Sequence, residues 1–143
     1  MTNQLSVEIE KDVPFYDVDA YQIAWHGHYP KYFEEARVAL LEKIGFSYDA
    51  MEASGYLFPV VELSTKYIQT MEYKQRVKVT AKLKQWEHKL VVDYLITDAA
   101  TGEKINKAST TQVAVLMPEK ILQYQSPQEL IDKIELFIHQ QND

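Results

Sequence analysis

Residues 16–45 read YDVDAYQIAWHGHYPKYFEEARVALLEKIG, and the rest of the chain is organised around this stretch. From residue 29 onward, apolar side chains recur at steps of three and four, which is the period of an amphipathic helix. Pro30 suits the first turn of such a helix, and Gly45 stands where a C-cap is expected. We therefore predict a helix over residues 29–44, about 24 Å long, whose wide apolar stripe must be covered by another layer. That stripe consists of Tyr29, Tyr32, Phe33, Ala36, Leu40 and Ile44.

The segments on both sides of this helix have β patterns. Residues 5–15 alternate between apolar and polar side chains, which predicts a first strand. Four later segments are rich in Val, Ile, Thr and Tyr, and they cover residues 57–68, 76–86, 90–100 and 103–117. Because residues 87–89 allow only a tight turn, these strands are expected to form an antiparallel meander.

Two shorter helices complete the expected order of elements. Residues 47–55 predict a short helix that ends at Gly55. Ser126-Pro-Gln-Glu129 has the pattern of a capping box and predicts the start of a C-terminal helix. The fold class is therefore α+β, with a curved antiparallel five-stranded sheet wrapped around one long central helix and a short C-terminal helix.

Composition limits the classes of function. A length of 143 residues fits one domain spanning residues 1–143. A net charge of −6 argues against general nucleic-acid binding, and the lack of cysteine excludes disulfides, thiolate metal sites and a cysteine nucleophile. Since there is no apolar run long enough to span a membrane and no signal-peptide pattern, we expect a cytoplasmic protein without a membrane span.

The stretch before the helix gathers two carboxylates, Asp17 and Asp19, and two imidazoles, His26 and His28. Aspartates in loops often cap turns, so a structural role for either one is open. The His-Gly-His spacing fits neither a zinc helix nor a thiolate finger, and we expect no metal site. There is no Gly-x-Ser-x-Gly elbow for a nucleophilic serine, and the four glycines lie too far apart for a phosphate loop.

The run Y-x-V-D-x-x-x-I-A-W-H-G-H-Y-x-x-Y-F-E-E-A-R over residues 16–37 resembles the N-terminal signature of hotdog-fold acyl-CoA thioesterases. The similar branch is that of the 4-hydroxybenzoyl-CoA thioesterases, which includes the Tol-Pal-associated thioesterases. Residues 57–69, LFPVVELSTKYIQ, are similar to the strand that follows in that family. The expected order of elements is also the hotdog order, so the resemblance covers nearly the whole chain. It implies an enzyme that hydrolyses an acyl-CoA to a carboxylate and CoA.

The resemblance also implies roles for individual residues. The catalytic carboxylate of the family falls on Asp19, as nucleophile or general base, and the backbone N–H of His26 falls where the thioester oxygen is bound. A helix N-terminus with free N–H groups suits that oxyanion. The implied substrate-binding residues are Gln22, Trp25, Gly27, His28, Tyr29 and Tyr67. Lys82, Lys84 and Lys89, near the Trp86 turn, are candidates for binding the CoA phosphates, and Lys104 and Lys107 come from the hairpin opposite. No other cofactor is expected.

Three positions depart from the family pattern. Gln22 stands where glycine is usual, His28 replaces Asn or Ser, and Thr70 lies where proline is common. A second reading therefore stays open, namely a non-catalytic acyl-CoA or acyl-carrier binding module on the same fold. The resemblance implies a homodimer or homotetramer with its pocket at a subunit interface, and an unpaired sheet edge would give the second copy a place to bind.

Overall fold

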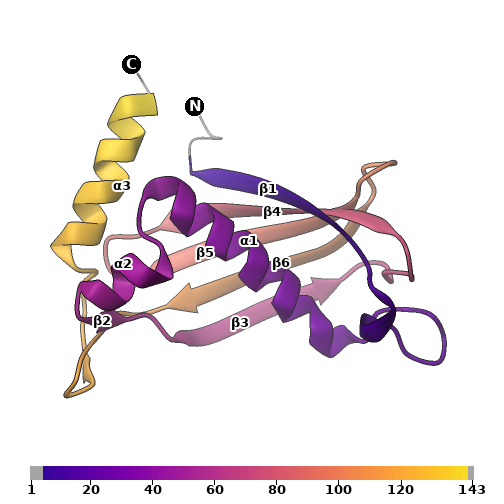
Figure 1. Cartoon of the computed structure of the whole chain (residues 1–143), viewed down its shortest axis with the longest axis horizontal. Helices are drawn as coiled ribbons and strands as arrows, with labels where there is room; N and C mark the ends of the chain where they lie inside the picture. The colour runs from indigo at the N-terminus through magenta and orange to yellow at the C-terminus, as the bar shows by residue number, and fades with distance from the viewer. Residues whose placement is uncertain (1–4, 142–143) are drawn as a thin grey trace.

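The computed structural model describes residues 5–141, in which five antiparallel strands form one curved sheet (Figure 1). The spatial order is β1-β4-β5-β6-β3, so β1 and β3 form the two edges. The bounds are Ser6–Asp12 for β1, Val60–Tyr67 for β3, Arg76–Gln85 for β4, Leu90–Asp98 for β5 and Lys104–Gln112 for β6. The five-stranded antiparallel sheet predicted from the sequence is confirmed.

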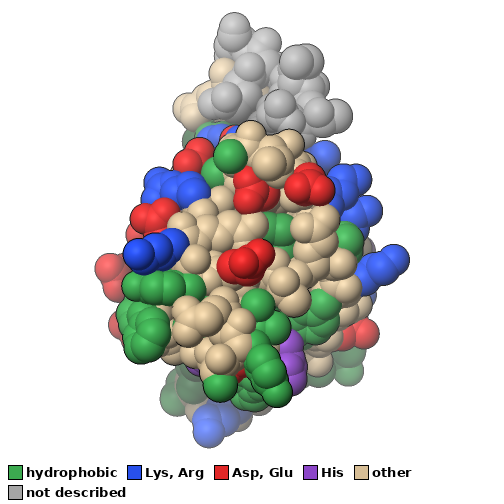
Figure 2. All heavy atoms as spheres, turned by 90° about the vertical axis from the view of Figure 1, so that its right-hand side faces the viewer, with side chains coloured by type: hydrophobic (Ala, Val, Ile, Leu, Met, Phe, Trp, Pro, Cys, Tyr) green, Lys and Arg blue, Asp and Glu red, His purple; other side chains and the backbone are tan. Residues whose placement is uncertain are grey.

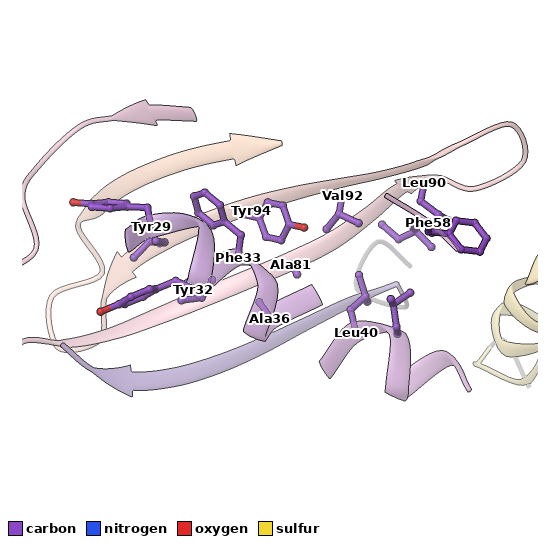
Figure 3. Close-up of a cluster of buried hydrophobic side chains, with 14 of the residues drawn as sticks. Tyr29, Tyr32, Phe33, Ala36, Leu40, Phe58, Ala81, Leu90, Val92 and Tyr94 are labelled. Atoms are coloured by element: carbon purple, nitrogen blue, oxygen red, sulfur yellow. The ribbon is translucent and has the colours of Figure 1, made fainter. Parts of the chain in front are cut away.

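The long helix α1 (Tyr29–Ile44) lies across one face of this sheet. Its predicted bounds are confirmed, and Gly45 ends it with a φ of 86°, a left-handed conformation that glycine adopts without strain. The sheet presents alternate side chains to it, so Val79 and Ala81 of β4 are buried while Lys78 faces away. Figure 3 shows Phe33 and Leu40 of α1 among side chains from several strands.

The remaining elements lie around this core. Two single turns of 3-10 helix, η1 (Phe15–Asp17) and η2 (His26–His28), precede α1, and α2 (Tyr48–Ala53) follows it. The helix expected after residue 125 is α3 (Gln128–Gln141). No helix among residues 5–141 is long and apolar enough to cross a membrane.

A second, small sheet was not predicted. It pairs β2 (Tyr56–Leu57), β7 (Val115–Leu116) and β8 (Ile121–Leu122) in that order. The sequence predicted one unbroken strand over residues 103–117, and this was wrong. The chain leaves the main sheet after Gln112, because beyond this point its backbone pairs with β2.

The predicted capping box at the start of α3 was also wrong. Ser126 is only 6% exposed, and its Oγ has no hydrogen-bond partner among the described residues. Its backbone N–H donates to the carbonyl of Glu87 in the β4–β5 turn. Ser126 is therefore tied to the sheet, and the carbonyl of Pro127 accepts the first helical amides instead.

The two sheet edges differ in character. On β1, the residues Glu8, Glu10 and Lys11 carry charges, and charges protect an edge strand from pairing with another chain. On β3 both faces are largely open, and its apolar side chains Val60, Val61, Leu63 and Tyr67 are each at least 43% exposed.

Candidate active site

The loop before α1 is folded into a tight hairpin that presents Asp19. Val18 pairs with Ala24, and the amide of Asp19 donates to the carbonyl of Ile23 at 3.0 Å. The hairpin closes through Gln22, whose φ of 66° is left-handed. A non-glycine residue in that conformation costs about 1–2 kcal/mol. Gln22 therefore takes the backbone conformation for which glycine, the residue usual here in the family, is suited.

Asp19 is exposed and lies at the mouth of a cavity of about 320 Å³. Its Oδ1 accepts the amide of Tyr21 at 2.8 Å, which fixes the side chain and leaves Oδ2 available. Figure 2 looks onto this end of the molecule, where green hydrophobic side chains lie beside a purple histidine. The cavity is lined by Asp19, Ile23, Ala24, Trp25, His26, Tyr29, Tyr67, Ile68, Gln69 and Thr70.

The amides of His26 and Gly27 lie at the start of η2. The first intrahelical bond of this turn runs from the amide of His28 to the carbonyl of Trp25, at 2.9 Å. The two preceding amides thus have no acceptor within the helix, and they donate to no backbone carbonyl elsewhere in residues 5–141. Because α1 continues directly from η2, the helix dipole adds partial positive charge at this point.

The cavity wall holds this turn in place. The hydroxyl of Tyr67, at the end of β3, donates to the carbonyl of His26 at 3.0 Å. The indole of Trp25 lies against Gly27, where an added Cβ would be 2.2 Å from the ring. A side chain at residue 27 would therefore have to displace the indole of Trp25, which lines the cavity.

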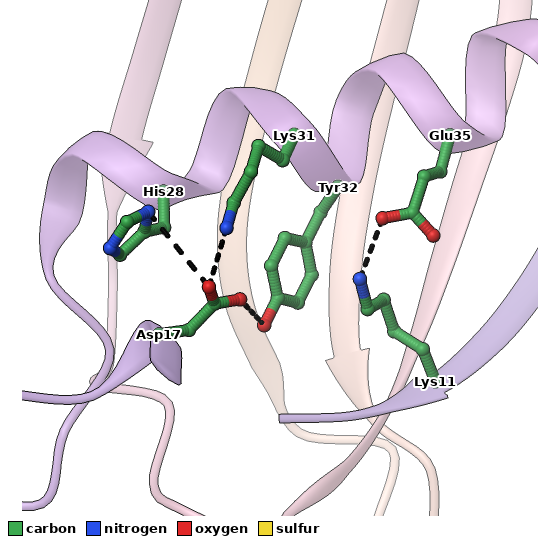
Figure 4. Close-up of polar contacts among 6 residues, drawn as sticks. All are labelled: Lys11, Asp17, His28, Lys31, Tyr32 and Glu35. Carbon is green, nitrogen blue, oxygen red and sulfur yellow. Dashed lines mark hydrogen bonds and ion pairs between the residues drawn. The ribbon is translucent and has the colours of Figure 1, made fainter. Parts of the chain in front are cut away.

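Asp17 has a different role from Asp19. It is 1% exposed, and its carboxylate accepts hydrogen bonds from the Nζ of Lys31 at 2.5 Å and the hydroxyl of Tyr32 at 2.8 Å (Figure 4). Burial alone would raise the pKa of Asp17, but these hydrogen bonds and the Lys31 charge outweigh it and hold the pKa below 3.8. Asp17 thus fastens the loop to the first turn of α1.

His28, which the family pattern left unexplained, belongs to the same network. Its Nδ1 lies 3.9 Å from Oδ1 of Asp17, and its ring is edge-on to Trp25 with centroids 5.4 Å apart. It does not line the cavity, and neither do Gln22 and Gly27. These three residues shape the loop and η2 around the cavity.

Sequence reasoning missed part of the cavity wall. Ile68 and Gln69 follow β3 directly, and their amides both donate to the carbonyl of Ile105. No motif marks them, because they reach the cavity only through the pairing of β3 with β6.

The lysines expected to bind CoA do not all lie at the same place on the surface. Lys82 borders a hollow of about 600 Å³ on the face of the sheet that α1 leaves open. Lys84 and Lys89 lie outside it, on the strand end and in the turn. Lys104 and Lys107 border the hollow too, together with Lys66, which the sequence did not suggest. None of these four lysines forms an ion pair within residues 5–141.

No cluster of three or more histidine, aspartate or glutamate side chains in the described part of the chain is arranged to hold a metal ion. The chemically capable groups of the residues that line the cavity include the Asp19 carboxylate, the His26 amide and the Tyr67 hydroxyl, and the Gly27 amide lies next to them in η2. A carboxylate facing a helix N-terminus can activate a nucleophile on one side of a carbonyl and stabilise its oxyanion on the other.

This fold and this cavity are those expected of a hotdog thioesterase, and the sequence comparison agrees with that class. The pattern of the Thioesterase-like superfamily matches residues 13–129, and the chain belongs to this family. The hotdog thioesterase resemblance of the sequence is confirmed.

Individual relatives of this chain are named as thioesterases. The candidate acyl-CoA thioesterase YneP of Bacillus subtilis is 31% identical over 107 residues, which cover 74% of this chain and 77% of YneP. Among solved structures, a DHNA-CoA thioesterase from Staphylococcus aureus has a TM-score of 0.76 at 27% identity, covering 82% of this chain and 78% of its own. A 4-hydroxybenzoyl-CoA thioesterase variant in complex with 4-hydroxybenzoyl-CoA has the same fold, with a TM-score of 0.79 at 17% identity over 91% of this chain and 99% of its own.

Proposed function

We propose that this protein hydrolyses acyl-CoA thioesters to a carboxylic acid and free CoA. The observation that supports it best is that Asp19 and the His26 amide border the same cavity, at the N-terminus of α1. Membership of the thioesterase family and the names of its relatives support the same reaction class.

In this proposal the thioester carbonyl lies between Asp19 and η2. Asp19 either attacks the carbonyl carbon itself, forming a mixed anhydride that water then hydrolyses to the free acid, or removes a proton from a water that attacks the carbon. The amides of His26 and Gly27 bind the oxyanion as negative charge develops on the carbonyl oxygen, and CoA leaves as a thiolate that takes up the proton released by the attacking water. Tyr67 keeps the His26 carbonyl, and with it the η2 turn, in position.

We further propose that Lys66, Lys82, Lys104 and Lys107 bind the CoA phosphates. Lys66 and Lys107 face each other across neighbouring strands, a like-charge pair that is unfavourable without an anion. Lys104 precedes Ile105, whose carbonyl holds the cavity residues Ile68 and Gln69. The pantetheine arm would pass round this end of β3 to reach the lysines.

The second copy that the sequence led us to expect is proposed to pair with β3. The exposed apolar side chains and free backbone groups of this strand suit an antiparallel partner. Since Tyr67 ends this strand and Ile68 follows it, the cavity would lie beside the interface. A tetramer, the cytoplasmic location and the absence of a further cofactor stay predictions.

The test of the reaction is release of free thiol from a panel of aliphatic and aromatic acyl-CoAs. We expect Asp19→Asn to lower kcat by about 10²–10⁴-fold, which is the usual contribution of a positioned acid–base group. Asp132→Asn, an exposed aspartate on α3, is the matched control and should leave the rate unchanged. Full activity in the Asp19 variant would contradict the proposed role.

The phosphate contacts are tested with the same assay by comparing an acyl-CoA with the corresponding acyl-pantetheine. Lys107→Gln should raise KM for the acyl-CoA several-fold and leave the acyl-pantetheine unaffected, because only CoA carries the phosphates. Lys89→Gln, outside the hollow, is the control. Equal effects on both substrates would remove the lysines from the proposal.

The alternative is a non-catalytic acyl-CoA or acyl-carrier binding module. It is favoured if no substrate of the panel is hydrolysed while acyl-CoA still binds with measurable affinity.

A further inference from the structure

Arg37 is a buried cation that has no anionic partner among residues 5–141. It lies in the third turn of α1 and is 6% exposed. Its Nε donates to the hydroxyl of Tyr48 at 3.2 Å, and its Nη1 donates to the hydroxyl of Tyr94 at 3.3 Å. Within residues 5–141, no carboxylate is within ion-pair distance of it.

The hydrogen bonds of Arg37 do not balance its buried charge. A buried charge is costly unless it is paired and hydrogen-bonded, and two neutral hydroxyls do not neutralise it. A guanidinium carries five N–H donors in a fixed fork, so donors remain for another acceptor. Tyr94 is itself held by Thr110, at 2.7 Å, which keeps the guanidinium oriented.

Arg37 borders a second cavity, of about 280 Å³, between α1 and the inner face of β3. Its other lining residues are the apolar Pro30, Phe33, Val60 and Leu63 and the polar or charged Lys31, Glu34 and Thr110. This cavity is distinct from the hollow that holds the lysines, which lies on the opposite face of the sheet.

The second cavity and the candidate active site are both lined by residues of α1 together with residues at or near β3, although they share no lining residue. On α1, Tyr29 lines the active-site cavity and Arg37 follows eight residues later, a distance of about 12 Å along the helix axis. On β3, Tyr67 lines the first cavity and Leu63 the second, four residues or about 13 Å apart. Along these two elements the lining residues of the two cavities are thus about 12–13 Å apart.

We propose that Arg37 binds a carboxylate at the far end of the acyl chain, so that the preferred substrates are ω-carboxyacyl-CoAs. This inference rests on the proposed thioesterase function. The chain would run from the thioester carbon past the apolar side chains of Phe33 and Leu63 and end at the guanidinium. A carboxylate matches the planar fork in a bidentate way, whereas a single aromatic ring is too short to span the distance between the two cavities.

The experiment compares two acyl-CoAs of equal chain length, suberoyl-CoA and octanoyl-CoA, which differ in the terminal carboxylate. For the wild-type protein we expect kcat/KM to favour suberoyl-CoA by about 10- to 100-fold, the range of a charge-assisted hydrogen bond that is made only with the carboxylate. In Arg37→Met this ratio should fall to about one or lower, and in Arg37→Lys it should fall only in part. Lys43→Met removes a cation from the far end of α1, outside the cavity, and should retain the wild-type ratio.

A binding measurement on the wild-type protein covers the case in which the arginine variants do not fold. Suberate should bind more tightly than octanoate in calorimetric titration and should raise Tm more at equal concentration. An equal response to both acids, or a wild-type preference for octanoyl-CoA, overturns the proposal. The proposal is also overturned if Arg37→Met changes the oligomeric state and keeps the suberoyl preference, because the arginine would then serve a subunit contact.

The outcomes also separate this inference from the function on which it rests. If no acyl-CoA is hydrolysed but suberate binds selectively, the thioesterase function fails and the arginine site stands. If octanoyl-CoA is hydrolysed as well as suberoyl-CoA, the function stands and the arginine site fails.

Discussion

Asp17 and Asp19 are two residues apart, and their surroundings give them opposite roles. Asp17 is buried and holds Lys31 and Tyr32, whereas Asp19 is exposed and borders the cavity. The hydrogen bonds that lower the pKa of Asp17 stabilise its charged form, which makes it a structural anchor. The resemblance of the sequence pointed to Asp19 as the catalytic carboxylate and left Asp17 a structural role, and the hairpin through Gln22 shows how their surroundings differ.

The anchor predicts a pH-dependent contribution to stability. Because the folded pKa of Asp17 lies below its unfolded value, its ionised form stabilises the fold above about pH 4, and this stabilisation is lost as pH falls through the folded pKa. Asp17→Asn should therefore lower the free energy of unfolding by about 1–3 kcal/mol at pH 7 and by less at pH 3. Urea denaturation at the two pH values measures the difference. A loss of equal size at both would show that the carboxylate charge is not what stabilises the loop.

At the scale of elements, the edge strand β3 does most to determine where ligands and partners can bind. It carries Tyr67 at one end, which holds the η2 turn, and Leu63 and Val60 further along, which line the arginine cavity. Its partner on one side is β6, and its other side is unpaired within the described residues. The sequence predicted this strand from its Val, Thr and Tyr content, but its position at the edge follows only from the strand order.

The open edge predicts a dimer that a single charge can disrupt. Val61 is 59% exposed on β3, and Val61→Lys should shift the protein toward monomer because a lysine opposes edge pairing. Analytical ultracentrifugation of wild type and variant over a concentration series measures the shift. Ile121→Lys, a change of similar kind at a 50% exposed position on β8, should leave the state unchanged. A wild-type protein that sediments as a monomer at all concentrations would contradict the proposed pairing.

At the scale of the whole molecule, the core lies between α1 and the inner face of the sheet, and the candidate sites lie along its margins. The active-site cavity is at the N-terminus of α1, the arginine cavity is beside the same helix, and the lysine hollow is on the opposite face of the sheet. The chain has a net charge of −6, so this lysine hollow departs locally from its overall charge. Such a local reversal of sign can attract an anion that the molecule as a whole repels.

The sequence by itself determined the elements whose signals are local. The apolar period of residues 29–44 and the alternation of residues 76–85 predicted α1 and β4, because side-chain periodicity reports which face is buried. Residues 16–45, which contain this helix, also placed Asp19 and His26 shortly before its start. The small sheet β2-β7-β8 was not predictable in this way, and neither was the failure of Ser126 to cap α3. Both depend on pairing with distant segments.

Only the tertiary structure decided which of these groups share a cavity. Tyr67 reaches His26 across 41 residues of chain, and Arg37 reaches Tyr94 across 57, through the packing of α1 on the sheet. A sequence records residue types and local spacing, whereas a site requires distances between residues far apart in the chain. The physical reason is that strand order and the curvature of the sheet, which set those distances, arise from the burial of all elements together.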